Sequence, residues 1–213
     1  MIKDTIENDK RDIEEYTKLY PELASADHIV FNEIHPEGTS PVFVVMGINP
    51  GEKGVTPRNM EINTENADRQ AVKPTPWVNK INYYVGNRPF VMTELFFWSS
   101  RNLTQFRERF GVLENSPHLE FCTQKNKKLI RFHKPRAVIC PGLGLIPPCK
   151  KHFDLELVQT RRRGDGARVC ELYKSEDGVP WVFTMHWTGA RGFTNQDKLL
   201  IKEMIQEVAP KYD

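Results

Sequence analysis

The stretch VFVVMGINPG, from Val42 to Gly51, decides the fold class. It begins with a continuous apolar run, which is typical of a strand that is buried on both faces in a parallel sheet. The run ends at Gly47, and Asn49, Pro50 and a second glycine follow shortly after. These residue types favour turns, so we predict a sharp turn directly at the carboxyl end of the strand.

The rest of the chain alternates between strand and helix patterns. Apolar runs predict two further buried strands, at residues 90–93 and 135–140. Shorter segments separated by turn residues predict strands at residues 155–160, 169–173 and 181–185. Apolar residues at helical spacing predict helices at residues 1–20, 77–85, 115–132 and 196–208. This alternation predicts an α/β fold, a three-layer α/β/α sandwich with a central, mainly parallel sheet.

The composition suits one globular domain over residues 1–213, with an N-terminal helix at 1–20 and a core at about 42–208. No apolar run reaches the about 18 residues that span a membrane, and the polar N-terminus is unlike a secretory signal. The four cysteines form no CxxC pair, which disfavours a zinc ribbon. The net charge is only +2, so local basic clusters must decide whether the chain binds nucleic acid.

Four residues follow predicted strands directly: Asn49, Glu94, Gly142 and His186. In open α/β sheets, ligands bind beyond the carboxyl ends of the strands. We therefore expect these four residues to converge on one site. The polar connection at residues 52–73 is long for a compact domain, which indicates a functional loop.

Three motifs resemble those of the uracil-DNA glycosylase superfamily. The stretch VFVVMGINPG resembles its first motif, in the GINPG form of mismatch-specific thymine/uracil glycosylases. HWTGARG, from His186 to Gly192, resembles its second motif, and HKPRAVICPGLG, from His133 to Gly144, resembles the strand between them. The resemblance covers about residues 42–208. It implies a three-layer α/β/α sandwich with a central, mainly parallel four-stranded sheet. It also implies an enzyme that flips a nucleotide out of DNA and hydrolyses its N-glycosidic bond.

The resemblance implies that Asn49 and His186 are catalytic. The Asn49 amide is no strong base, but it can hold a water beneath C1′, which suffices if the bond breaks largely before water attacks. His186 would donate a hydrogen bond to O2 of the leaving pyrimidine. Backbone N–H groups around Ile48 and Gly51 would contact the base or the flanking phosphate. The alternatives are a turn without chemistry and a histidine satisfied within the fold.

The resemblance also indicates which residues hold DNA, single- or double-stranded. Thr188 stands where the family has a serine, and Arg191 would fill the gap left by the flipped base. Arg161, Arg162 and Arg163 surround a turn near the last strand and would track phosphates. A surface arginine on a phosphate is the alternative for Arg191. A solvated helix face is the alternative for a second basic cluster at residues 125–136.

Glu94 departs from the family pattern, in which an Asn commonly reads N3–H and O4 of uracil. A carboxylate would repel O4. A protonated carboxyl donates to a ring nitrogen and accepts from an exocyclic amine, which complements cytosine or adenine, and desolvation can keep it neutral. Glu94 therefore indicates an amino-bearing or modified base. The alternative is an acid at a helix N-terminus, where it would interact with the helix dipole.

We predict a monofunctional DNA glycosylase of base excision repair, with uracil or mispaired thymine as default substrate and a modified cytosine as runner-up. A catalytically silent nucleic-acid-binding module on the same fold is the alternative, disfavoured by the joint presence of Asn49 and His186. A nucleotide-binding protein is disfavoured because GxGxxG and GxxxxGK[ST] are both missing from the sequence. We expect a cytoplasmic, nucleoid-associated monomer that uses no metal and no cofactor.

Overall fold

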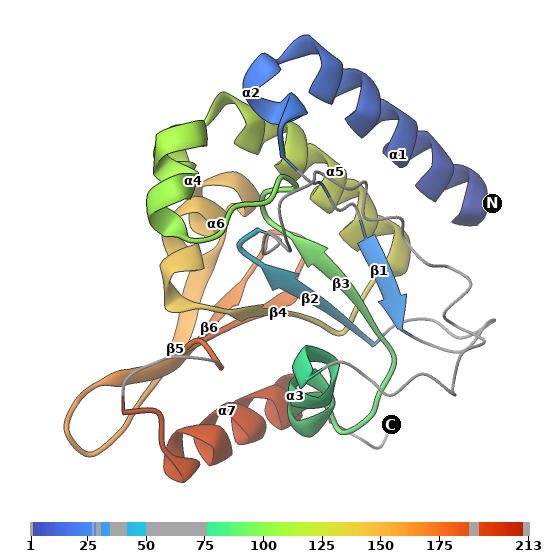
Figure 1. Ribbon diagram of the computed structural model, residues 1–213. Helices are drawn as coiled ribbons and strands as arrows, with labels where there is room; N and C mark the ends of the chain where they lie inside the picture. Colours follow the sequence, from blue (N-terminus) through green and yellow to red (C-terminus); the bar gives the residue numbers. More distant parts are fainter. Residues whose placement is uncertain are drawn as a thin grey trace.

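A computed structural model describes residues 2–26, 28, 31–34, 42–49, 76–187 and 192–210 of the chain. In these residues, seven strands form one mixed sheet in the order β1-β3-β2-β4-β7-β6-β5 (Figure 1). The strands are β1 (Phe31–Ile34), β2 (Phe43–Gly47), β3 (Phe90–Glu94), β4 (Ala137–Pro141), β5 (Glu156–Arg162), β6 (Arg168–Lys174) and β7 (Pro180–Thr184).

The four central strands, β3, β2, β4 and β7, are parallel. The expectation of four strands holds for this centre but is wrong for the sheet as a whole. At one edge β1 pairs antiparallel with β3, and at the other β6 and β5 continue antiparallel from β7. The strand β1 was not predicted, because its four residues, FNEI, carry little apolar pattern and pair only with a strand distant in sequence.

Helices cover both faces of the sheet (Figure 1). On one face lie α1 (Ile2–Leu19), α2 (Pro21–Ala24), α4 (Leu103–Phe110), α5 (Pro117–His133) and α6 (Ile146–Phe153). On the other lie α3 (Pro76–Val85) and α7 (Asn195–Val208). Within the described residues, no helix is both long and apolar enough to cross a membrane.

Alternate residues of each central strand feed the two cores. In β2, Val44 and Met46 pack beneath α1 and α5, whereas Phe43 and Val45 pack against α3 and α7. All four side chains are buried. Burial of such a side chain contributes about 1.5–3 kcal/mol, which explains why the strand is apolar without interruption.

Three helices, α2, α4 and α6, were not predicted, although local signals mark α4 and α6. Asn102 caps α4 by accepting a hydrogen bond from the Gln105 backbone N–H, and Gly111 ends the helix with a φ of 76°. The helix α6 begins with Ile146-Pro147-Pro148, and proline is tolerated in a first helical turn. Both helices have only eight residues, which is too short for a clear apolar period.

Candidate active site

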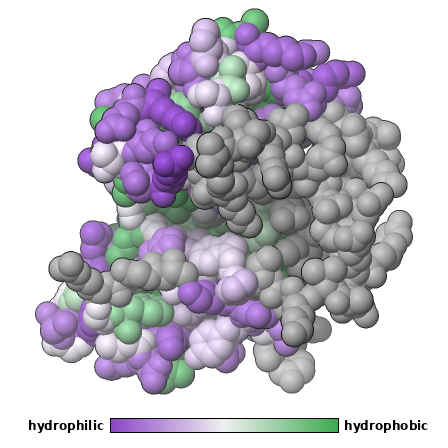
Figure 2. All heavy atoms as spheres, viewed as in Figure 1, coloured by the Kyte–Doolittle hydropathy of each residue, from purple (hydrophilic) through white to green (hydrophobic). Residues whose placement is uncertain are grey.

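The candidate site lies at the carboxyl edge of the four parallel strands. Asn49 follows β2 by two residues, Glu94 ends β3, Gly142 follows β4, and His186 follows β7 by two residues. Because the strands are parallel, all four residues lie at the same edge of the sheet. The strands β2 and β3 end toward a hollow between α4 and the layer of α3 and α7 (Figures 1 and 2).

Three residues predicted for the site, Gly51, Thr188 and Arg191, lie outside the described residues. The predicted functional loop at residues 52–73 lies outside them as well.

The Asn49 side chain is held by the segment that follows β3. Its Nδ2 donates to Ser100 Oγ at 2.9 Å and more weakly to the Trp98 carbonyl at 3.4 Å. A carbonyl oxygen can only accept, so this contact identifies the amide nitrogen and fixes the orientation of the amide. The sequence gives no signal for this role of Ser100, which lies 51 residues from Asn49.

Backbone hydrogen bonds hold the turn itself. The N–H of Leu95 donates to the Gly47 carbonyl at 2.8 Å, and the N–H of Phe96 donates to the Ile48 carbonyl at 2.9 Å. These bonds continue the β2–β3 pairing beyond the ends of both strands. The predicted base-contacting residue Ile48 is therefore fixed in place, and its side chain packs against the core beneath α5.

Glu94 lies directly against Gly47, its partner in the β2–β3 register. A Cβ atom on residue 47 would overlap the Glu94 carboxyl group, which explains the glycine. Glu94 Oε2 is buried and has no hydrogen-bond partner among the described residues. Burial raises the pKa of Glu94 to about 8, so the carboxyl group is mainly protonated at neutral pH.

The alternative of a helix N-terminal acid is wrong, because Glu94 is the last residue of β3 and α4 begins only at Leu103. Its backbone is anchored to α5: Asn126 Nδ2 donates to the Glu94 carbonyl at 2.9 Å, and Thr93 Oγ1 donates to Asn126 Oδ1 at 2.7 Å. The strand end that carries the carboxyl group is therefore rigid.

His186 lies beside an aromatic cluster at the start of α3. Its ring and that of Trp77 are nearly parallel, with an interplanar angle of 18° and centroids 6.1 Å apart. The next residue, Trp187, is buried against Trp77 and Tyr84, with centroids 5.5 and 4.4 Å away. His186 itself is exposed. Trp187 anchors the chain after β7 and leaves the imidazole at the surface of the site.

The predicted DNA-binding arginines differ in their surroundings. Arg161 is 14% exposed and forms ion pairs with Glu203, at 2.9 Å, and with Glu207, both on α7. Arg162 is exposed and donates to the Gly166 carbonyl at 2.9 Å. The guanidinium group of Arg161 thus attaches α7 to the sheet, whereas that of Arg162 faces solvent.

The Arg163 side chain contacts Gly192, the last residue of the second motif. It donates to the Gly192 carbonyl at 2.9 Å, and its Nε lies 3.7 Å from Oδ1 of the fully buried Asp197. Asp197 also closes a capping box with Thr194 at the start of α7. Arg163 therefore connects the predicted basic turn with the end of the His186 loop.

The second basic cluster, on α5, is partly neutralised by acids of α1. Lys125 pairs with Asp9 at 2.9 Å and with Asp12, and Lys128 pairs with Asp9 at 3.3 Å. These contacts attach α1 to α5 and favour the interpretation of a solvated helix face.

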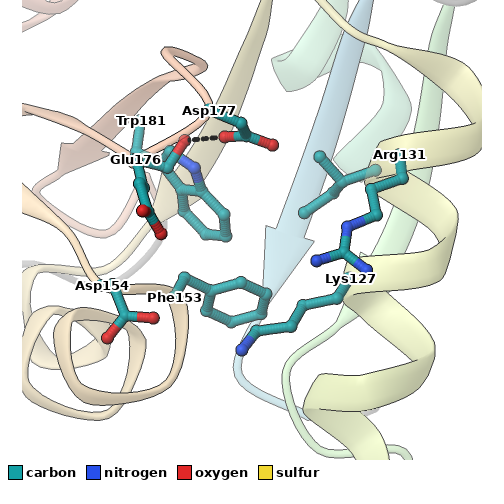
Figure 3. Close-up of a pocket in the computed structure, with 9 residues that line it drawn as sticks. Lys127, Arg131, Phe153, Asp154, Glu176, Asp177 and Trp181 are labelled. Carbon is teal, nitrogen blue, oxygen red and sulfur yellow. Dashed lines mark hydrogen bonds between the residues drawn. The ribbon is translucent and has the colours of Figure 1, made fainter.

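A separate cavity of about 170 Å³ lies near the opposite edge of the sheet (Figure 3). Lys127 and Arg131 line one side, Asp154, Glu176 and Asp177 line the other, and Phe153 and Trp181 lie between them. Trp181 follows the first residue of β7, so the cavity is at the amino ends of the strands. It contains none of the predicted site residues.

The cysteines and other metal-binding residues add no second centre in the described part of the chain. Cys122, Cys140 and Cys149 lie in the core beneath α5, and Cys170 lies in the core on the other face of the sheet. All four are buried thiols. Among the described residues, no three His, Cys, Asp or Glu side chains are grouped so that they could hold a metal ion.

Comparison of the sequence with protein-family models gives no match, and comparison with curated proteins gives none either.

Proposed function

We propose that the chain is a monofunctional DNA glycosylase, built on the three-layer scaffold of the uracil-DNA glycosylase superfamily. The observation that carries the proposal is the position of Asn49 and His186, which both follow strands of one parallel set and lie at one edge of the sheet. A glycosylase needs a water placed at C1′ and a donor for the departing base, and these two side chains can supply both.

Asn49 would position the water. Its Nδ2 is directed at Ser100 and Trp98, so the amide is held in one orientation before any substrate binds. A preorganised group costs little reorganisation in the transition state. An amide does not take a proton from water at neutral pH, so the base must depart early, through an oxocarbenium-like state.

His186 would stabilise the departing base. Its exposed imidazole lies at the same edge, between the Trp77 ring and the end of β7. A ring N–H that donates to O2 of a pyrimidine strengthens its bond as negative charge builds on the base. Trp77 is suited to contact a flipped base because it is only half-buried and lies next to the imidazole.

The test is release of a base from synthetic DNA. Oligonucleotides would carry uracil, a thymine mispair, hypoxanthine, 5-hydroxymethylcytosine or its glucosylated form, and alkali would cleave at abasic sites. Strand scission should vanish in Asn49→Ala and fall about 100-fold or more in His186→Ala, as for loss of an oxyanion donor.

Matched controls separate these effects from general damage. Asn8→Ala removes an exposed amide on α1 that bonds to Arg11, and His152→Ala removes a histidine on α6 that pairs with Glu120. Both should retain full activity. If DNA is bound but no base on the panel is released, the proposal is wrong and the chain is a binding module.

A further inference from the structure

The carboxyl group of Glu94 is not used by the reaction described so far. It lies at the same edge of the sheet as Asn49 and His186, one strand away from the Asn49 turn. Oε2 is packed against Gly47 without a hydrogen-bond partner among the described residues. A polar atom buried in this way costs roughly 1–3 kcal/mol, so its retention calls for a functional explanation.

The surroundings of Glu94 favour its neutral form. Its carboxyl group lies against Gly47 on β2, and its main-chain carbonyl accepts from the amide of Asn126 on α5; neither group titrates. No cation of the described residues forms an ion pair with it. Burial alone raises its pKa to about 8.

We propose that Glu94 donates a proton to the ring nitrogen N3 of an amino-bearing pyrimidine, a base of the cytosine class, as its glycosidic bond breaks. This inference rests on the proposed glycosylase function and names the substrate class of the same site. It gives the carboxyl group a catalytic role, because its proton moves to the departing base.

The step is balanced within the site. The C1′–N1 bond breaks, and its electron pair stays on the base. The Glu94 proton moves to N3, so the base leaves as a neutral tautomer. Water held by Asn49 adds to C1′, and the proton that this water loses returns to the Glu94 carboxylate, directly or through solvent. The sum is hydrolysis of one bond by one water, and the enzyme is regenerated.

The chemistry of the leaving group selects the cytosine class. The uracil anion spreads its charge over two carbonyl groups, whereas cytosine has only one and is the poorer leaving group. N3 of uracil carries a hydrogen and cannot accept a proton, whereas N3 of cytosine has a lone pair. A neutral carboxyl group therefore assists the departure of cytosine at a position where uracil has no acceptor.

The position of His186 favours a pyrimidine over adenine. Adenine offers the same amine beside a ring nitrogen, but it has no O2 to which the imidazole could donate. Unmodified, paired cytosine must be spared in any genome. The substrate is therefore a cytosine that carries a substituent or lies in a mispair, which also lowers the cost of flipping.

The experiment compares bases, variants and pH in single-turnover assays with excess protein. The DNA carries cytosine in a mispair, 5-hydroxymethylcytosine, its glucosylated form, uracil or adenine at one position. Wild type, Glu94→Gln and Glu94→Asn are assayed between pH 6 and 9. Glutamine retains one donor and one acceptor but cannot transfer a proton, so it separates base reading from proton donation.

We expect wild type to release a cytosine-class base at a rate that falls as the pH rises through about 8. Glu94→Gln should bind the same DNA but release the base about 100-fold more slowly, without that pH dependence. His186→Asn should retain the high-pH decline, which assigns the titration to Glu94. The base panel and the wild-type pH profile test the inference even if a Glu94 variant does not fold.

Three outcomes overturn the inference. Release of uracil or adenine in preference to every cytosine-class base would refute it and leave the glycosylase function standing. Equal rates and equal pH profiles for wild type and Glu94→Gln would make Glu94 a reader of the base and no acid. If no base is released by wild type, the proposed function itself fails, and the inference fails with it.

Discussion

Gly47 and Glu94 are paired across β2 and β3, and the Glu94 carboxyl group occupies the space that a Cβ atom on residue 47 would need. The ideal Cβ position overlaps Oε2 of Glu94 and lies 2.8 Å from its Cδ, closer than real Cβ contacts allow. The first glycine of the GINPG turn is thus required by a side chain of the next strand. The turn that carries Asn49 and the carboxyl group of Glu94 form one structural unit.

Gly47→Ala should therefore displace the Glu94 carboxyl group. The new methyl group meets a packed side chain at a rigid strand end, so we expect a loss of about 1–3 kcal/mol in the free energy of unfolding. Denaturant unfolding measures this loss. Base release should also fall by at least tenfold, because the carboxyl group and the turn both shift.

The matched control is Gly144→Ala, where an added Cβ meets nothing within 4 Å. It should unfold like wild type. A double-mutant cycle with Glu94→Ala should recover most of the loss caused by Gly47→Ala, since the clash is then removed. Simple additivity of the two changes would contradict the contact between Gly47 and the Glu94 carboxyl group.

Glu94 should also make the stability of the protein depend on pH. Its pKa is about 8 in the folded chain and near its ordinary value of 4.5 when unfolded. Between these values the native state binds a proton that the unfolded state has lost. The free energy of unfolding therefore decreases as pH rises through this window and levels off above pH 8.

Glu94→Gln removes this titration. Its melting temperature should exceed that of wild type at pH 9, by an amount equivalent to a few kcal/mol at most, and the difference should shrink toward pH 5. Thermal denaturation followed by circular dichroism at several pH values measures it. A difference between the two proteins that does not change with pH would show that Glu94 does not titrate in this window.

The central part of the fold could be predicted because its physical signal is local. The four parallel strands are apolar runs buried on both faces, and each leads into a turn or a loop. Predicted and observed boundaries differ by a residue or two, as for β2 (Phe43–Gly47) against residues 42–46. The short elements β1, α2, α4 and α6 were missed because tertiary packing stabilises them more than their own pattern does.

The site could be predicted in position but not in its supporting contacts. That Asn49 and Glu94 lie at one edge follows from the alternation of strands and helices, which indicates parallel strands whose carboxyl ends share an edge. The bond from Asn49 to Ser100 and the overlap at Gly47 depend on register, and no periodicity reports register. The ion pairs of Arg161 with α7 could not be predicted either. A basic turn has the same sequence pattern whether its charges are free or paired with acids distant in sequence.

Ser100 should act as a positioning residue for Asn49. Ser100→Ala removes the 2.9 Å acceptor of Asn49 Nδ2 and leaves the weaker 3.4 Å contact to the Trp98 carbonyl in place. Loss of one neutral hydrogen bond is worth about 1 kcal/mol, so we expect a roughly fivefold lower rate of base release. Affinity for DNA should stay unchanged, because Ser100 is buried. Single-turnover rates and DNA titrations separate the two.

The neighbouring Ser99→Ala is the matched control. Ser99 is also buried, and its Oγ has no hydrogen-bond partner among the described residues. Removing this hydroxyl breaks no bond identified in the fold, so the rate should equal that of wild type and the stability should not fall. Equal effects of the two substitutions would remove the positioning role of Ser100. Rescue by Ser100→Thr, which restores a hydroxyl, would support it.

Arg161 and Arg162 are adjacent in sequence, but we expect them to affect different properties. Arg162→Met removes an exposed charge that donates to the Gly166 carbonyl. If Arg162 contacts one phosphate, the slope of log affinity against log salt should become about 0.9 less steep, with the melting temperature unchanged.

Arg161→Met removes the ion pairs with Glu203 and Glu207 and should lower the free energy of unfolding by about 1 kcal/mol, since the partner carboxylates are exposed. Its salt slope should equal that of wild type. An unchanged slope in Arg162→Met would show that this turn does not follow the DNA backbone, because Arg162 is the arginine of the three whose charge faces solvent most fully.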